Sequence, residues 1–436
     1  MSAPVAVRGS LAYFVDDPFL TDPRTAFVHE PDGLLVCRDG LIEAVGPADR
    51  LRQQLPPGLE PVHYPGGIIL PGFIDTHVHF AQIEIIGAYG ERLLDWLEAR
   101  AFPAERRFAD RAHAEAMATR FCDELLRNGT TTALVFCAVY PQSVDALFAE
   151  AARRNLRLAA GKVLMDRNAP ADLLDTAQTG YDDSKALIAK WHRHGRGMYA
   201  ITPRFAPTST PAQLEAAGTL WREHPDVLVQ THVSESVDEV AWVRRLYPER
   251  ANYLDVYDHY GLLGRRAVLA HAVHLTEPEL ARSHETGAAL AHCPTSNLFL
   301  GSGLFRVHAA KDPRRPVPVG LGTDVGAGTS FSALATLNEA YKVARLHGDA
   351  LTALQGFFLA TLGGARAMGL EQHVGSFAPG READFVVLDP AATPLLALRT
   401  GRAESIEDVL FALMTLGDDR AVQATYVAGN LAHRRG

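Results

Sequence analysis

The segment PGFIDTHVH, residues 71–79, is an apolar run that ends in two histidines separated by one residue. Side chains two positions apart on a β-strand point to the same face of the sheet, so His77 and His79 can face one site. An H-x-H pair alone is weak evidence, because a pair of surface histidines fits it equally well. The pair becomes informative only if later strands of the same sheet end in similar residues.

Eight short apolar runs alternate with helical patterns along the chain. Continuous apolar strands separated by helices are typical of a parallel sheet covered by helices, and eight such units that close on themselves form a (β/α)8 barrel. We therefore predict an α/β fold built on a TIM-like barrel. The predicted strands are residues 67–79, 130–136, 156–165, 198–205, 226–232, 267–271, 287–292 and 316–324.

The two ends of the chain have a different pattern, with short alternating patches before residue 66 and after residue 382. Asp39-Gly40 between two of these patches is a typical hairpin turn. We predict one small β-sandwich domain assembled from both termini. Its first part is residues 1–70, the barrel is 71–370, and its second part is 371–436.

Composition excludes several classes of protein. The 436 residues are 47% hydrophobic and 21% charged, as in ordinary soluble enzymes. A net charge of −9 offers no cationic surface for nucleic acid. No apolar run approaches the roughly 18 residues of a membrane span, and Arg8-Gly9-Ser10 interrupts the stretch where a signal peptide would lie. We expect a cytoplasmic protein that binds neither nucleic acid nor membranes.

The four cysteines are far apart and form no C-x-x-C pair. This spacing argues against a disulfide framework and against a cysteine-based zinc site in a chain of this size. The 18 histidines are the more informative residues.

Several predicted strands end in residues that can bind a metal or transfer a proton. His232 ends the fifth run and is followed by Glu235, His271 ends the sixth, and Asp324 ends the eighth. The active sites of (β/α)8 barrels are built from these strand ends. Imidazoles combined with a carboxylate suit Zn²⁺ or Fe²⁺ with an open position for water. Each residue has a structural alternative, such as a core histidine or a turn-capping aspartate, but their joint occurrence at strand ends predicts a metal site.

These motifs carry a resemblance that covers essentially the whole chain. The segments THVSE (231–235), LAH (269–271), AHCPTSN (291–297) and GTD (322–324), together with residues 71–79, resemble the amidohydrolase superfamily. Within it, residues 95–97, 102–105, 161–166 and 201–205 are similar to guanine deaminases. The resemblance implies zinc-dependent hydrolysis of guanine to xanthine and ammonia in purine catabolism, by a homodimer. One departure is Ser236, where some relatives carry Asn.

The resemblance also implies the metal ligands, which are His77, His79, His232 and Asp324. Relatives with two metals bridge them with a carboxylated lysine on the fourth strand. This chain has Arg204 there, and Lys162 on the third strand comes too early to replace it. We therefore expect one Zn²⁺ per chain, with Fe²⁺ as the other candidate.

In the implied mechanism, Glu235 transfers protons between the attacking water, the ring and the departing amine. Asp324 orients the nucleophile, and His271 lies close to the metal without being a principal ligand. These three residues are the predicted catalytic groups.

Guanine presents a carbonyl at C6 where adenine presents an amine, so a fixed donor at that position selects guanine. Arg204 is the candidate donor, because its guanidinium is always charged, and Gln82 is the candidate second contact. Phe205, Trp96 and Leu97 are the candidate walls of the ring site. The structural alternatives are a salt bridge for Arg204, a solvent-facing loop position for Gln82 and core packing for the aromatic residues.

Three other functions remain to be weighed. A deaminase or chlorohydrolase acting on another purine, a pterin or a triazine would share the metal motif. A catalytically inactive scaffold of the same fold should have lost ligands, yet every ligand and Glu235 are present. A deaminase of flipped nucleic-acid bases is disfavoured by the acidic composition.

Overall fold

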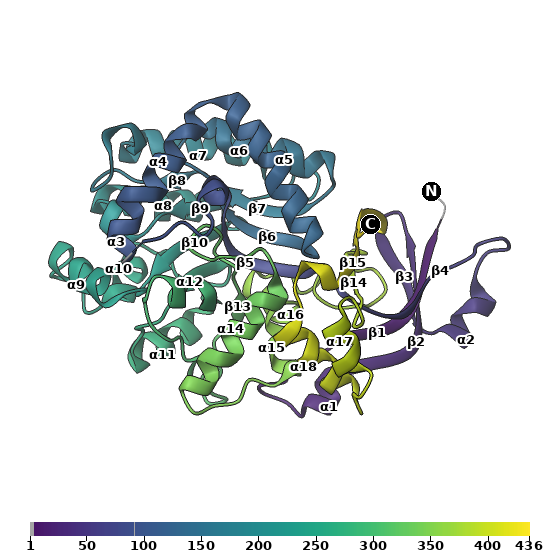
Figure 1. Cartoon of the computed structure of the whole chain (residues 1–436). Helices are drawn as coiled ribbons and strands as arrows, with labels where there is room; N and C mark the ends of the chain where they lie inside the picture. The colour runs from purple at the N-terminus through teal and green to yellow at the C-terminus, as the bar shows by residue number, and fades with distance from the viewer. Residues whose placement is uncertain (1–3, 91) are drawn as a thin grey trace.

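The computed structural model describes residues 4–90 and 92–436. Figure 1 shows a barrel wrapped by helices and, beside it, a smaller sheet that carries both ends of the chain. Residues 1–3, which belong to the predicted first part of the small β domain, lie outside the described residues.

Eight parallel strands form a nearly closed barrel in the order β13-β12-β11-β10-β9-β7-β6-β5, and the short β8 adds to β9. Nearly every residue of these strands is buried, which explains why they appear in the sequence as continuous apolar runs. Each of the eight predicted runs coincides with one strand of this path, except that run 156–165 is broken at Lys162 into β7 and β8 and that β10 extends one residue beyond run 226–232. The strands are β5 (Phe73–His79), β6 (Thr130–Phe136), β7 (Arg157–Gly161), β8 (Val163–Leu164), β9 (Met198–Pro203), β10 (Leu228–Val233), β11 (Ala267–His271), β12 (Ala289–His292) and β13 (Val319–Leu321).

The prediction of one strand over residues 67–79 is wrong at Gly72. The chain forms β4 (Val62–Pro71) in the smaller sheet and then β5 in the barrel. The Gly72 N–H donates to the carbonyl of Asp384 at 3.0 Å, and a Cβ at this position would clash with the side chain of Thr131. The apolar run is therefore continuous in sequence but shared between two sheets.

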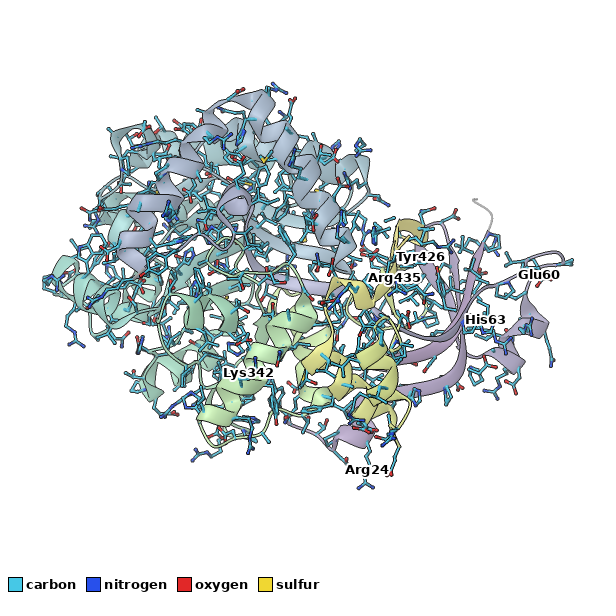
Figure 2. All side chains as sticks on the ribbon, viewed as in Figure 1. Arg24, Glu60, His63, Lys342, Tyr426 and Arg435 are labelled. Atoms are coloured by element: carbon cyan, nitrogen blue, oxygen red, sulfur yellow. The ribbon has the colours of Figure 1, made fainter. Side chains whose placement is uncertain are left out.

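The smaller sheet has seven strands in the order β16-β15-β14-β4-β1-β2-β3. As predicted, it draws strands from both termini, and Asp39 and Gly40 turn the β2–β3 hairpin with φ of 51° and 84°. Figure 2 shows Tyr426 and Arg435 on the side nearer the barrel, with Glu60 and His63 away from it. The remaining strands are β1 (Val5–Phe14), β2 (Phe27–Arg38), β3 (Leu41–Pro47), β14 (Phe385–Leu388), β15 (Val422–Val427) and β16 (Asn430–Arg434).

Helices cover the outside of the barrel, and none in the described part of the chain is long and apolar enough to cross a membrane. They are α5 (Arg111–Arg127), α6 (Pro141–Arg153), α7 (Ala177–Trp191), α8 (Pro211–Glu223), α9 (Val237–Leu246), α10 (Tyr253–His259), α11 (Glu277–Thr286), α12 (Pro294–Phe299), α13 (Val307–Ala310), α14 (Ala333–Leu346), α15 (Ala353–Leu359) and α16 (Leu362–Ala367). α1 (Pro23–Ala26) and α2 (Ala48–Leu51) pack on strands of the smaller sheet, whereas α18 (Ile406–Leu416) packs on α14 and α15 and on α17 (Pro394–Thr400).

The connection between β5 and α5 is longer than the others and forms one wall of the barrel mouth. It consists of a 3₁₀ helix (Phe80–Ile85), α3 (Leu93–Trp96), a π-helical turn (Leu97–Ala101) and α4 (Phe102–Arg106). Its buried side chains include Trp96, Leu97 and Phe102, which pack with Phe205 from the opposite wall. Long βα connections of this kind are where barrel enzymes place substrate contacts.

A cluster of mostly buried ion pairs joins the barrel to Glu382 and Asp384, which come just before β14 of the smaller sheet. Arg157 and Arg196 both donate to the Glu382 carboxylate, with Nε–Oε2 distances of 2.7 and 3.0 Å, and Arg196 also donates to Asp384 at 3.1 Å. Burial alone would raise the pKa of Glu382, but the two arginines outweigh it and lower that pKa below its usual value.

Glu382→Gln should therefore destabilise the folded chain by about 3 kcal/mol at pH 7, because it leaves the mostly buried Arg157 without a charge partner and Arg196 with Asp384 alone. Because the pKa of Glu382 is lower in the folded state than in the unfolded state, its carboxylate stabilises the fold at pH values above the unfolded pKa of about 4.3. This stabilisation is lost as the pH falls through the folded pKa. The stability difference from the parent, measured by denaturant unfolding, should thus shrink below pH 4. The exposed Glu285→Gln serves as a control, and an equal loss at pH 7 and pH 3.5 would contradict this assignment.

Candidate active site

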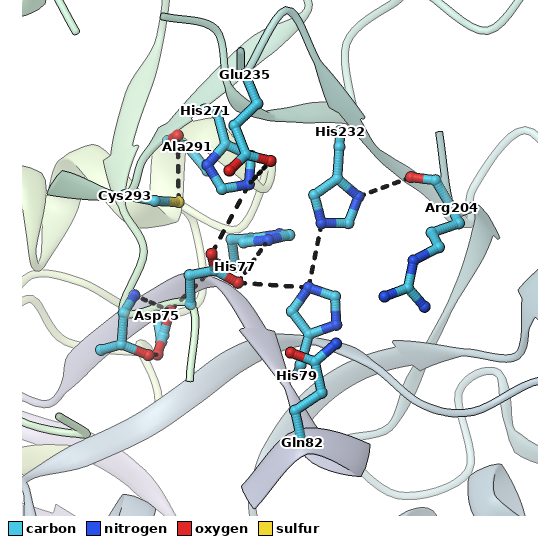
Figure 3. Close-up of polar contacts among 12 residues, drawn as sticks. Asp75, His77, His79, Gln82, Arg204, His232, Glu235, His271, Ala291 and Cys293 are labelled. Atoms are coloured by element: carbon cyan, nitrogen blue, oxygen red, sulfur yellow. Dashed lines mark hydrogen bonds and ion pairs between the residues drawn. The ribbon is translucent and has the colours of Figure 1, made fainter. Parts of the chain in front are cut away.

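The C-terminal ends of four barrel strands bring the predicted histidines and aspartate together. His77 and His79 come from β5, His232 from β10 and His271 from β11, and Asp324 follows β13. All five are at most 8% exposed. Figure 3 shows His77, His79, His232 and His271 around one centre, with Glu235 beside His271.

The ring nitrogens converge closely enough to share one ion. The Nε2 atoms of His79 and His232 are 3.1 Å apart, and the Asp324 Oδ1 lies 3.2 Å from His77 Nε2 and 3.4 Å from His79 Nε2. His77, His79 and His232 offer ligand atoms within 4.8 Å of one another. The Nε2 of His77 is buried and makes no hydrogen bond within the described chain. This donor set fits a divalent metal ion.

Hydrogen bonds on the far side of two rings fix which nitrogen faces the cluster. His232 Nδ1 lies 2.7 Å from the backbone carbonyl of Arg204, and His271 Nδ1 lies 2.9 Å from Asn297 Oδ1. Both partners are oxygen acceptors, so each Nδ1 carries the proton and donates it. The Nε2 of His232 is then left with a free lone pair toward the centre, as in an orientated metal ligand, whereas the Nε2 of His271 faces the carboxylates of Glu235 and Asp324.

The surroundings of the cluster favour neutral His77, His79 and His232 and an ionised Asp324. It lowers the pKa of His77, and it lowers the pKa values of His79 and His232 still further, helped by the neighbouring His77. Burial would raise the pKa of Asp324, but His77 and the other imidazoles outweigh it and bring that pKa to about 2. Neutral imidazoles and an ionised carboxylate are the forms that bind a metal.

Glu235 lies just beyond β10 as a buried acid beside the cluster. Its Oε1 accepts a hydrogen bond from the Ser302 hydroxyl at 3.0 Å, and its Oε2 is 3.5 Å from His271 Nε2. Burial raises its pKa to about 7, and the nearby carboxylates of Glu239 and Asp324 raise it in the same direction. A carboxyl group with a pKa near neutrality can both accept and return a proton.

One cavity of about 360 Å³ joins the cluster to the predicted substrate contacts. Every residue assigned to substrate in the sequence analysis lines it, namely Gln82, Trp96, Leu97, Arg204 and Phe205. His232, Glu235, His271 and Asp324 line the same cavity. Leu93, Leu300 and Ala327 add apolar wall that sequence reasoning missed, because an isolated apolar residue in a loop gives no signal.

The structural alternatives for the substrate contacts can now be compared with their positions. Gln82 is 2% exposed and is not a solvent-facing loop residue. Arg204 does form a salt bridge, with Nη1 at 2.8 and 2.7 Å from the Glu105 oxygens, and it lines the cavity as well. Lys162 pairs with Asp175 at 2.5 Å.

Sequence reasoning gave no role to three residues that hold the site in place. Glu105 and Asn297 occur in the segments of resemblance 102–105 and 291–297 without an assigned role, and Ser302 follows in a stretch that contains no acid or base. Two contacts fix the backbone of Ser302. Its N–H donates to the Asn297 carbonyl at 2.8 Å, and its own carbonyl lies 2.8 Å from His274 Nε2. These partners are set by loop packing, which residue spacing does not show.

Comparison with known proteins agrees with this geometry. The model of the "Amidohydrolase family" matches residues 68–432. The chain belongs to the amidohydrolase family. It is 52% identical over 433 residues to guanine deaminase of Escherichia coli strain K12, covering 99% of this chain and 98% of that protein.

Two solved structures are also similar to this family member. Guanine deaminase from Bradyrhizobium japonicum superposes with a TM-score of 0.96 at 41% identity, and each chain is covered completely. Guanine deaminase from C. acetobutylicum, with guanine bound in its active site, superposes with a TM-score of 0.87 at 28% identity, covering 98% of this chain and 100% of that one.

Proposed function

We propose that this amidohydrolase converts guanine and water to xanthine and ammonia. The observation that carries the proposal is the cavity that Gln82 and Arg204 line together with His232 and Glu235, and Figure 3 shows Arg204 and Glu235 on opposite sides of His232. The high identity to a guanine deaminase over nearly the whole chain supports the same substrate. Trp96, Leu97 and Phe205 provide an apolar slot suited to a flat ring.

His77, His79, His232 and Asp324 would hold one divalent ion, with Zn²⁺ favoured by three imidazoles and one carboxylate. A bound ion of this kind lowers the pKa of water and so supplies hydroxide at neutral pH. Lys162 is held by Asp175, which supports one ion rather than two.

Glu235 would carry the protons of the reaction. Attack of water at C2 makes that carbon tetrahedral, and Glu235 takes a proton from the water and gives it to N3. Glu235 then transfers the proton of the new C2 hydroxyl to the amine, the C2–N bond breaks, ammonia leaves, and C2 becomes the second carbonyl of xanthine. The raised pKa of Glu235, about 7, suits a group that must accept and release protons in turn.

Two neighbours would orient the reacting atoms. Asp324 stays ionised and can accept a hydrogen bond from the attacking water, which fixes the direction of attack. His271 faces both acids, with Nε2 at 3.5 Å from Glu235 and 3.8 Å from Asp324. Burial would lower the pKa of His271, but those two acids outweigh it and raise that pKa. It is therefore placed to donate to the oxygen added at C2.

The substrate can be tested directly by measuring ammonia release from purified protein with guanine, adenine, a pterin and a triazine. Guanine should be converted to xanthine, and adenine should be almost untouched, because it presents an amine where Arg204 requires an acceptor. Comparable turnover of adenine, or rapid turnover of a triazine with none of guanine, would overturn the proposal.

The metal site predicts close to one bound ion per chain. Elemental analysis of purified protein should find it, and His77→Ala should lose the ion together with its contribution to thermal stability. His63→Ala is the matched control, because this exposed histidine lies on the smaller sheet away from the barrel (Figure 2). Two equivalents of metal in active protein, or full metal retention in His77→Ala, would contradict the assigned ligands.

Glu235→Gln separates proton transfer from metal binding. Glutamine keeps the size and can accept a hydrogen bond from Ser302, but it cannot take and return a proton. The variant should retain its metal and bind guanine, while kcat falls at least ~10²-fold and KM changes less. Exposed Glu60→Gln is the control (Figure 2). Loss of the metal would make Glu235 a ligand, and near-parental turnover would assign the proton transfer to another residue, with His271 first.

The homodimer implied by the resemblance to guanine deaminases stays a prediction, and so do the boundaries of the barrel and the terminal β domain.

A further inference from the structure

A buried carboxylate lies behind the two residues that face the substrate ring. Glu105, on α4, is 1% exposed and accepts hydrogen bonds from both of them. Arg204 Nη1 donates to its two oxygens at 2.8 and 2.7 Å, and Gln82 Nε2 donates to Oε1 at 2.9 Å. The three side chains form one network, which we call the Glu105 network.

The Glu105 network determines which end of the Gln82 amide faces the cavity. An ionised carboxylate can only accept hydrogen bonds, so the NH₂ end of Gln82 must point to Glu105. Within the described chain, the Gln82 side chain makes no second hydrogen bond. Its carbonyl oxygen is therefore left for the cavity that Gln82 lines, and Gln82 presents an acceptor there.

Arg204 presents hydrogen-bond donors to the cavity, where Gln82 presents an acceptor. A guanidinium has donors alone, and the hydrogen bonds of its side chain in the described residues use Nη1. Its Nη2 and Nε groups are left as donors on the side chain that lines the cavity. The cavity thus offers a donor beside an acceptor, and Glu105 holds both in that order. Glu105 also compensates the buried charge of Arg204, which is 2% exposed.

The order of atoms around a guanine ring matches this arrangement. Going round the ring, the O6 acceptor is followed by the N1–H donor, then C2 with its amine, and then N3. In Figure 3 Arg204 and Glu235 lie on opposite sides of His232, with Gln82 beside His79 and His271 beside Glu235. With C2 at the histidine cluster and N3 at Glu235, the edge formed by O6 and N1–H falls on Arg204 and Gln82.

We propose that Glu105 is the positioning residue that sets the donor–acceptor order of the cavity and thereby selects heterocycles with a 2-amino lactam edge. Adenine presents the reverse order, a donor on the exocyclic nitrogen and an acceptor at N1. 2-Aminopurine keeps the amine at C2 but lacks both O6 and N1–H. The inference rests on the proposed function, and it adds the chemical feature by which that site would choose its substrate.

The test compares guanine and 2-aminopurine as substrates of parent and Glu105→Gln protein. A glutamine at 105 keeps the size but removes the charge and can donate as well as accept, so the Gln82 amide is free to turn over. The kcat/KM for guanine should fall about 10- to 100-fold, while that for 2-aminopurine changes little, so discrimination collapses. Metal content should be unchanged. Glu105→Asp should recover part of the discrimination, and exposed Glu98→Gln should match the parent.

The outcomes separate this inference from the proposed function. A parent protein that does not deaminate guanine would overturn the proposed function itself. A parent that does, combined with a Glu105→Gln variant that loses activity equally on both substrates or on neither, would overturn the role of Glu105. If Glu105→Gln fails to fold, Gln82→Leu keeps the ion pair and removes the orientated acceptor, and it should lose discrimination in the same way. Full discrimination in Gln82→Leu would overturn the inference.

Discussion

The site depends on how the barrel closes between its first and last strands. β5 and β13 end the path of the sheet, and Asp75 links them in place of a regular ladder. Its carboxyl accepts hydrogen bonds from the backbone N–H and the hydroxyl of Thr323 and from the backbone N–H of His77 at 3.2 Å. The Asp324 N–H then donates to the His77 carbonyl at 2.9 Å. β5, which carries His77 and His79, is thus joined to the residues after β13, including Asp324, at the point where these three proposed metal ligands emerge.

Burying these polar groups together is unfavourable in two ways, which are visible in their pKa values and in the backbone angles at the strand ends. Burial raises the pKa of Asp75 to about 7 and lowers the pKa values of His77, His79 and His232. The backbone also takes left-handed φ values at the strand ends, 48° at Ser234, 70° at His271 and 49° at Asp324. Such values disfavour residues other than glycine and are kept where the surrounding structure holds them. Both costs fall at the residues that would bind the metal or lie beside it.

The barrel and the residues at its strand ends could be predicted from the sequence because each rests on a local pattern. A strand buried on both faces must be apolar throughout, and the polar residue that ends it, such as His271 on β11, is conspicuous. The break at Gly72 could not be predicted, since the apolar run crosses it without change and the cause is a contact with Thr131. Glu105 and Ser302 are likewise set by packing between distant loops, and nothing in their own spacing marks them.

Arg204 links recognition of the substrate to the geometry of the metal site. Beyond the break at Lys162, β8 pairs with the end of β9, and the Arg204 N–H donates to the Leu164 carbonyl at 3.2 Å. This pairing carries the Arg204 backbone into the barrel mouth, where its carbonyl accepts a hydrogen bond from the Nδ1–H of His232. The side chain of the same residue is held by Glu105. Because the Arg204 carbonyl holds His232, a proposed metal ligand, and the Arg204 side chain lines the cavity, a shift of β9 would move both together. In the proposed binding mode, the position of Arg204 at the end of β9 therefore sets the distance between the recognised edge of the ring and the reacting carbon.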